Sequence, residues 1–416
     1  MKNPEYVKAD PASAGKKPDV AVEKQLAVVC SPSDQDDAKQ QYDEQVNPED
    51  SKDKQFTFET ASGIASAMTL MSSSEYVMHM GQPPVEQKSL FDQLIDYFIV
   101  YEVPIGLINK LLELRHYRLN FLIDDSGSMQ LQSDAPKSEA TVYMPCHGQG
   151  GNMTRLEEEE NRLHIFMDIL AFIPTKGIQF YFMNTDREIK LDQNGKSPDE
   201  FKQEAHSAIR DAFSHLYMGA TPTYRLLTKS FKDSHDHSGD PTAHYLLTDG
   251  CPSDKSASEV GKLIKNRSHP QRNPMTLLSC TNVDSECEWM KDIEEIAPFT
   301  SECDDFSDER AEVVKDQGIA FPYTRGFWLI SGLVAAMNPH DLDALDESIP
   351  LTKHTLDEIL GRSHSAAEYS YYFNHNPHAR YYADKFERFL TEPVTAVQIV
   401  PKNQQKNRKK NGCTIM

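Results

Sequence analysis

The sequence predicts an α/β fold, a doubly wound and mostly parallel sheet with helices on both faces, extended by helical segments at either end. Two observations lead to this prediction. Short apolar runs, which are typical of buried strands, alternate along the chain with longer segments whose apolar residues recur at helical spacing. The first run also ends in oxygen-bearing side chains, and open α/β sheets place their ligands at such strand ends. Alternation of this kind implies right-handed crossovers between parallel strands.

The elements follow from local signals in chain order. A helix over 88–101 ends at Pro104, and a second helix over 105–115 leads into the first strand. Thr154 and Ser197 each begin a helix with an acidic first turn. Strands are expected at 119–123, 178–183, 188–191, 244–248, 275–280 and 298–303. Further helices are expected at 154–173, 197–216, from the 219–223 loop to 231, and at 255–266, 285–296, 307–316 and 324–337.

Composition divides the 416 residues into five parts. Residues 1–56 are polar and predicted to be disordered, and residues 57–114 form a helical lead-in. The α/β domain spans 115–340, an aromatic-rich helical extension spans 341–400, and a basic tail spans 401–416. The formal net charge of −21 argues against nucleic acid as a partner of the body of the chain.

The seven cysteines form no CxxC pair, which favours reduced thiols in a cytosolic compartment over a zinc or disulfide framework. No apolar stretch approaches the roughly 18 residues that span a bilayer, and the first residues lack the apolar segment of a secretory signal. We therefore expect a cytoplasmic protein that reaches a membrane, if it does so, by means other than a transmembrane helix.

Oxygen side chains gather in three loops of the predicted fold. Asp124, Ser126 and Ser128 follow the first strand, Thr221 opens a helix, and Asp249 follows the strand at 244–248. In a parallel sheet these loops lie at one edge, where their side chains can converge. Carboxylates and hydroxyls without imidazole or thiolate select a hard ion, Mg²⁺, Mn²⁺ or Ca²⁺. Each loop alone is more simply a turn or an N-cap; their joint occurrence predicts a divalent-metal site.

The order Asp-x-Ser-x-Ser, then Thr, then Asp resembles the metal-ion-dependent adhesion site of the von Willebrand factor A (vWA) family over roughly residues 115–340. The resemblance implies that Ser126, Ser128 and Thr221 coordinate the ion directly, while Asp124 and Asp249 act partly through bound water. It also implies a binding module in which an exposed Asp or Glu of a protein partner completes the coordination. The polar insertion at 131–153 and the Tyr224-Arg225 pair depart from the pattern, and Asp125 has no assigned role.

The last four residues, Cys413-Thr-Ile-Met416, match a CaaX box, which predicts prenylation of Cys413. One lipid chain anchors a protein only weakly, and a basic run supplies a second attraction to an anionic membrane surface. That run consists of Lys402, Lys406, Arg408, Lys409 and Lys410. The alternative is a solvated basic tail that contains a cysteine. Prenylation would place the protein at the cytosolic face of a membrane, as a eukaryotic protein or a bacterial effector acting in a host.

We therefore expect a membrane-tethered, non-enzymatic adaptor that binds a partner's carboxylate through a metal. Two alternatives stay open: an enzyme or host-directed effector whose chemistry lies in the extensions, and an assembly factor that docks on an ATPase. No nucleophile–base pair stands out, since Cys146-His147 lacks an orienting partner. Residues 157–160, four consecutive glutamates, are interpreted as a solvated helix start. His364, His375 and His378 are interpreted as helix packing.

Overall fold

The computed structural model describes residues 89–100, 102–236, 239–281, 283–319, 321–337, 342, 345 and 348–400. All of them belong to the unit Phe58–Met416. The expected disordered segment 1–56, most of the lead-in before residue 89, and the tail 401–416 with Cys413 lie outside the described residues.

A six-stranded sheet forms the centre of the described part, with the strand order β5-β4-β1-β6-β7-β8. Five strands are parallel, and β5 alone pairs antiparallel, with β4. This topology confirms the predicted α/β, mostly parallel fold. The chain leaves β1 on one side for β4 and later returns to its other side as β6, so β1 lies at the switch point where such sheets bind ligands. The strands are β1 Arg118–Ile123, β4 Ile178–Phe182, β5 Glu188–Leu191, β6 Thr242–Thr248, β7 Met275–Ser279 and β8 Thr300–Cys303.

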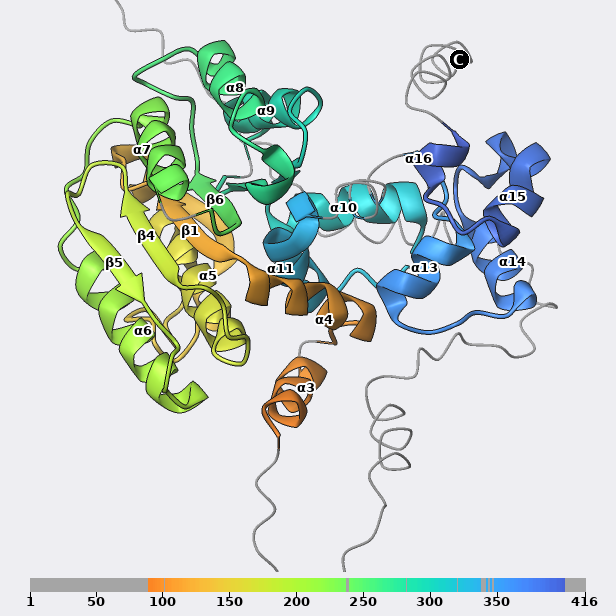
Figure 1. The fold of residues 1–416 in the computed structure, drawn as a ribbon, viewed down its shortest axis with the longest axis horizontal. Helices are drawn as coiled ribbons and strands as arrows, with labels where there is room; N and C mark the ends of the chain where they lie inside the picture. Colours follow the sequence, from red (N-terminus) through yellow and green to blue (C-terminus); the bar gives the residue numbers. More distant parts are fainter. Residues whose placement is uncertain are drawn as a thin grey trace, which may run out of the picture. The chain divides into compact units, whose positions relative to one another are not determined.

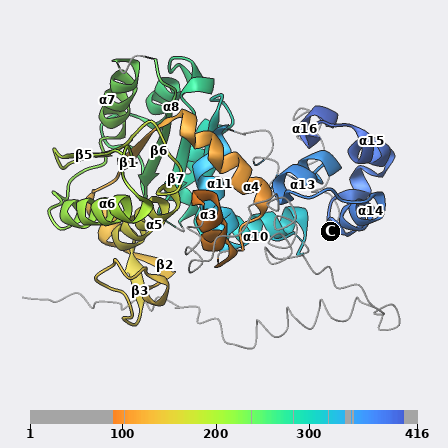
Figure 2. The same ribbon diagram turned by 60° about the horizontal axis from the view of Figure 1, so that its bottom comes forward.

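Helices cover both faces of the sheet, as predicted, and Figure 2 shows α5 and α6 on one side and α7 and α8 on the other. The side-chain alternation of β1 explains this, because Phe121 and Ile123 enter one apolar core while Leu122 enters the other. The crossover helices are α5 Arg155–Leu170, α6 Pro198–Phe213, α7 Thr223–Asp236, α8 Ala257–Lys265, α9 Asp284–Glu294, α10 Phe306–Gln317 and α11 Arg325–Val334. The capping boxes predicted at Thr154 and Ser197 are both formed.

The segments on either side of the sheet share its larger core. Side chains from Leu94 to Val400 belong to the same buried cluster as Phe121. Before the sheet lie α3 Leu90–Val100 and α4 Ile105–Leu111; after it lie α13 Lys353–Leu360, α14 Ala366–His375, α15 Phe386–Thr391 and α16 Ala396–Ile399 (Figure 1). Short 3₁₀ turns cover Leu112–His116, Gly127–Gln130, Lys137–Glu139, Pro270–Arg272, Ala335–Met337, Ala379–Tyr381 and Ala383–Lys385.

Helices α4 and α13 approach each other closely because glycines face each other. A Cβ atom on Gly106 would lie 1.8 Å from the carbonyl oxygen of Glu358. Gly361, the C-cap of α13, has a φ of 68°, and a Cβ there would lie 1.9 Å from Ile105. The described part of the 341–400 extension is helical, as predicted, and these contacts show that it packs directly on the lead-in.

The polar insertion after β1 contains a small antiparallel sheet, β2 Gln132–Pro136 and β3 Asn152–Thr154 (Figure 2). Met144, Cys146 and Met153 form a separate apolar cluster inside it. The insertion is anchored on α5, where the Thr141 amide donates to Asn161 Oδ1 at 2.8 Å. It is an ordered element beside α5.

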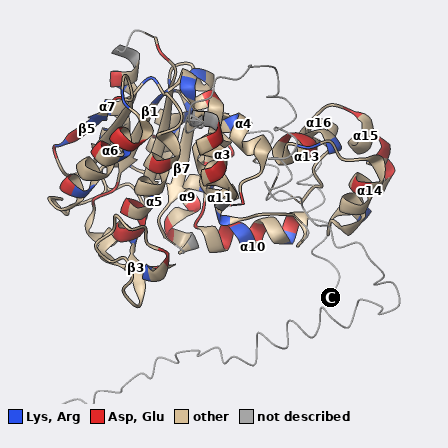
Figure 3. Cartoon of the chain, turned by 90° about the horizontal axis from the view of Figure 1, so that it is seen from below, with Lys and Arg blue, Asp and Glu red and all other residues tan. Residues whose placement is uncertain are grey.

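Acidic and basic residues alternate along the chain in Figure 3, and α10 carries both kinds. Among the described helices, none is both long enough and apolar enough to cross a membrane.

Candidate metal centre

Three loops meet at the carboxyl ends of β1 and β6. Ser126 pairs with Gly219 in a parallel bridge, and the Gly127 amide donates to the Gly219 carbonyl at 3.0 Å. The Ser253 amide in turn donates to the Thr221 carbonyl at 2.8 Å. Backbone hydrogen bonds thus hold the loop after β1, the loop before α7 and the loop after β6 together.

Four of the five predicted ligands are joined by direct hydrogen bonds. The Ser126 and Ser128 hydroxyl oxygens lie 3.1 Å apart, and the Ser128 hydroxyl donates to Asp249 Oδ1 at 2.8 Å. The Ser126 amide donates to Asp124 Oδ1 at 2.9 Å. Thr248, the last residue of β6, donates its hydroxyl to Asp124 Oδ2 at 2.5 Å. Both carboxylates are fully buried.

Hydrogen bonds to its backbone carbonyl hold Thr221, the fifth predicted ligand, beside the other loops. Its carbonyl accepts from the amides of Ser253 and Thr223, each at 2.8 Å, and its side chain is buried. Its hydroxyl makes no hydrogen bond to any residue that the structure describes. Since the hydroxyl has no protein partner there, it is available to a ligand.

Asp125, which had no assigned role, holds the loop after β4. Its carboxylate accepts from the amides of Asn184 and Thr185, at 2.7 and 2.9 Å, and from the Thr185 hydroxyl at 2.6 Å. The Asn184 amide group also donates to the Ala220 carbonyl at 2.8 Å. A Cβ atom on Gly219 would lie 2.4 Å from Asn184 Oδ1, so a larger residue there would displace the Asn184 side chain. Asp125 therefore positions the Thr221 loop through Asn184.

Arg155 is a site residue that the sequence analysis missed. Its guanidinium donates to Asp249 Oδ2 at 2.8 Å and lies 3.0 Å from Glu286 Oε2. A signal existed in the sequence, because a cation in the first turn of a helix opposes the helix dipole and calls for an acidic partner. For Asp124, burial is the largest effect. It raises the pKa of this carboxyl to about 6, and the charge of Asp249 adds to the increase.

The interpretation of Glu157 to Glu160 as a solvated helix start is wrong. Glu159 is fully buried and Glu160 is 8% exposed. The reason is that α5 packs on the sheet with one side and on α6 and the insertion with another, so few positions of its first turns reach water. Burial raises the pKa of Glu159 well above its usual value, with Asp124 the next largest cause. Both Glu159 oxygens lack a hydrogen-bond partner.

The donor set fits a hard divalent ion. It consists of hydroxyl and carboxylate oxygens, and the buried carboxyls of Asp124, Asp125 and Glu159 have no ion pair among the described residues, which favours a bound positive charge. Among the described residues, no three His, Cys, Asp or Glu side chains gather in an arrangement that would hold a metal by themselves. The hydroxyls of Ser126, Ser128 and Thr221 would therefore have to supply most of the direct ligands.

The other residues that the sequence brought into question have structural partners. His364 Nδ1 lies 2.6 Å from Asp357 and His378 Nε2 lies 2.8 Å from Asp316, both in helix packing. Burial raises the pKa of the Cys146 thiol, which disfavours the reactive thiolate. The Arg225 guanidinium donates to the Met183 carbonyl at 2.7 Å.

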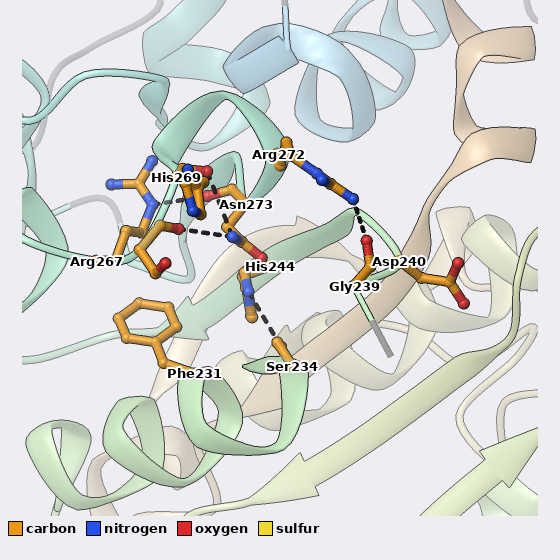
Figure 4. A pocket seen from close by; sticks show the side chains of 10 residues that line it. Phe231, Ser234, Gly239, Asp240, His244, Arg267, His269, Arg272 and Asn273 are labelled. Atoms are coloured by element: carbon orange, nitrogen blue, oxygen red, sulfur yellow. Dashed lines mark hydrogen bonds between the residues drawn. The ribbon is translucent and has the colours of Figure 1, made fainter. Parts of the chain in front are cut away.

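A cavity of about 260 Å³ lies at the opposite edge of the sheet, where Gly239 precedes β6 and Asn273 precedes β7 (Figure 4). Burial lowers the pKa of His244 there to about 3, so its ring is neutral. The Arg267 guanidinium donates to four backbone carbonyls, those of Ile264, Asn273, Pro298 and Phe299. Arg272 and Asp240 of this cavity are engaged as well, by the Gly239 carbonyl and by Arg118.

Fold and site together define an α/β protein with an oxygen-lined centre at the switch point of its sheet. Among solved structures it is similar to a mutant PilB minor pilin from Streptococcus sanguinis, with TM-score 0.36 and 13% identity over 56% of this chain and 62% of that one. It is also similar to a von Willebrand factor type A protein from Catenulispora acidiphila, with TM-score 0.29 and 14% identity over 46% and 38% of the two chains.

A third similar structure is the ArnB paralog VWA2 from Sulfolobus acidocaldarius, with TM-score 0.28 and 14% identity over 49% and 45% of the two chains. Two of these three names carry the family that the motif order resembles. At these values the likenesses carry no argument about what the chain binds. No family model and no curated protein matches the sequence.

Proposed function

We propose that the described part of the chain is a protein-binding module whose three-loop site holds a divalent cation and, through it, a carboxylate of a partner. The observation that supports the proposal best is the convergence of Ser126, Ser128 and Asp249 within hydrogen-bond distance, beside the loop that carries the uncommitted hydroxyl of Thr221. Three loops that are far apart in sequence supply oxygen atoms to one place, and none of these side chains is an imidazole.

Ser126, Ser128 and Thr221 would hold the ion directly, with Asp124 and Asp249 behind them. The ion would supply a positive centre that an Asp or Glu of the partner could complete. Mg²⁺ fits a site with few charged ligands because it keeps part of its water shell, and an outside carboxylate can replace such a water. Tyr217 and Met218, 73% and 40% exposed, precede the bridge at Gly219 and offer apolar contacts beside the ion.

Capture of a partner in Mg²⁺ and in EDTA tests this function. Immobilised full-length protein should retain a partner in Mg²⁺ and release it in EDTA, and Asp124→Ala should retain none in either buffer. Ser214→Ala is the control. Ser214 is the exposed C-cap of α6, and its hydroxyl bonds to the Asp211 carbonyl rather than to any residue of the three-loop site. Capture that is the same in EDTA, or that survives Asp124→Ala, would show that no ion bridges the two proteins.

We further propose that Cys413 carries a prenyl group and that the basic tail adds attraction to anionic lipid, so that the module works at the cytosolic face of a membrane. The support is the sequence Cys413-Thr-Ile-Met416 with its preceding Lys and Arg residues. In cell fractionation, Cys413→Ser should move the protein from the membrane to the soluble fraction. Membrane retention equal to that of the wild type would rule this anchor out.

A further inference from the structure

Glu159 lies beneath the three-loop site in a position that packing alone does not explain. It belongs to α5 one turn after Arg155, is fully buried, and has no hydrogen-bond partner for either carboxyl oxygen. A buried carboxyl without a partner costs free energy, and such a group calls for a compensating charge.

Acidic groups of the site surround this carboxyl. The charges that act on Glu159 most strongly are those of Asp124, Asp125 and Asp249, and each adds to the increase that burial causes in the pKa of its carboxyl. Glu159 therefore faces the loop after β1 and the loop after β6, the two loops that carry the site's carboxylates.

The two arginines of α5 pair with other groups, although Nε of both and Nη2 of Arg162 have no hydrogen-bond partner among the described residues. Arg155 pairs with Asp249 and Glu286, at 2.8 and 3.0 Å. Arg162 donates to the Ser279 carbonyl at 3.1 Å and lies 3.7 Å from Glu158. Neither guanidinium forms an ion pair or a hydrogen bond with Glu159, so the helix that carries this acid does not neutralise it.

The acids at the site outnumber its cations. Asp124 and Asp125 accept hydrogen bonds only from neutral donors, and Arg155 is shared between Asp249 and Glu286. A bound divalent cation would reduce this excess of negative charge, to which Glu159 contributes.

We propose that Glu159 is a buried counter-charge of the cation site, which raises the affinity of the site for a divalent ion from outside the set of direct ligands. The inference rests on the proposed function, because it assigns a role at the same site. A role outside the set of direct ligands agrees with the described residues, among which no three His, Cys, Asp or Glu side chains gather in an arrangement that would hold a metal. Such a residue is a positioning residue, and groups behind the direct ligands typically change metal affinity by about 10- to 100-fold.

The test compares Glu159→Gln with Glu160→Gln in the full-length protein. The two substitutions are matched, since both remove one buried carboxyl from adjacent positions of α5, and Glu160 faces His164 rather than the site. Isothermal titration with Mg²⁺ should show a Kd raised by about 10-fold or more in Glu159→Gln and within twofold of wild type in Glu160→Gln. Without ion, Glu159→Gln should have a Tm at least equal to that of the wild type, and Mg²⁺ should raise that Tm less.

A Kd equal to the wild-type value in Glu159→Gln would overturn this inference and leave the proposed function standing. A wild-type protein that binds no divalent ion would overturn both. A lowered Tm with an unchanged Kd would show that the carboxyl serves packing alone. Loss of the folded state in both Glu159→Gln and Glu159→Met, measured by circular dichroism, would likewise overturn the inference, because the carboxyl would then hold α5 in place.

Discussion

Arg155 is the cation that compensates the buried carboxylate of Asp249 beside the site. It is 5% exposed and pairs with Asp249, which is fully buried. Removing one partner of such a pair leaves the other charge buried and uncompensated. We predict that Arg155→Met lowers the free energy of unfolding by about 3 kcal/mol in EDTA, measured by urea denaturation.

The matched control is Arg187→Met. Arg187 pairs with Asp211 on the surface, where both side chains are 40% or more exposed, and exposed pairs contribute less than about 1 kcal/mol. If Arg155→Met and Arg187→Met cost the same, Arg155 does not compensate Asp249 in the way described.

Glu160 and His164 make the stability of the folded protein depend on pH, in a direction that follows from their pKa shifts. Burial, then Glu157, raises the pKa of Glu160 to about 7, and burial, then His206, lowers the pKa of His164 to about 3. Asp168 of α5, His206 and Arg210 of α6, and the Tyr143 ring also face this pair. A raised carboxyl pKa gives stability that is complete below the unfolded pKa and is lost as pH rises through about 7.

Glu160→Gln should therefore be more stable than the wild type at pH 8, by about 2 kcal/mol, and should lose that advantage at pH 5. The lowered pKa of His164 has the opposite effect, because its contribution to stability is lost as pH falls below the unfolded pKa. His164 is present in both proteins, so this effect does not distinguish them. Urea denaturation at the two pH values measures the difference. An equal difference at both pH values would contradict the pKa assignment; Glu288→Gln, exposed on α9, controls for the change in net charge.

Among individual residues, the sequence predicted the oxygen-bearing side chains of the site but not the residues that lie behind them. Asp124, Ser126, Ser128, Thr221 and Asp249 were found because each stands at a strand or helix boundary that the local pattern reveals. Arg155 and Glu159 lie inside a helix, where the sequence shows only that four acids follow an N-cap. Which of them is buried depends on α6 and the insertion, which come from elsewhere in the chain.

Among the elements, the contact of α4 with α13 depends on glycine. Because a Cβ on Gly106 would overlap the backbone of Glu358 and Ile359, Gly106→Ala must push the two helices apart. We predict a loss of about 2–3 kcal/mol in the free energy of unfolding, measured by urea denaturation.

Gly150→Ala is the control for that substitution, because nothing lies within 4 Å of the Cβ it adds. A Gly106→Ala protein as stable as Gly150→Ala would show that the two helices do not approach as closely as described.

The strands and helices were predictable because each has local signals. All six strands of the main sheet were predicted within about two residues of their observed bounds, and the crossover helices follow the predicted alternation. The small sheet of β2 and β3 was not predicted, since its polar residues have no alternating pattern. The contact between Gly106 and Gly361 was not predictable either, because it joins positions that are distant in sequence.

For the whole molecule, one apolar core joins α3, α4, one face of the sheet and the helices after it. The sequence predicted helices on both sides of the α/β domain, and the structure shows that their side chains share its core. The domain limits at 115 and 340 stay a prediction. The core gives the three loops a rigid support, which a site assembled from three separate loops requires.

The central claim is that these loops bind a divalent cation, and titration of the full-length protein with Mg²⁺ tests it most directly. Thr221→Ala removes one uncommitted hydroxyl, and Thr228→Ala removes a similar hydroxyl that bonds only to the Tyr224 carbonyl on the exposed side of α7. By isothermal titration calorimetry, we expect one Mg²⁺ per chain in the wild type and in Thr228→Ala, and at least about tenfold weaker binding in Thr221→Ala. Equal Mg²⁺ binding in the two variants, or none in the wild type, would contradict the account.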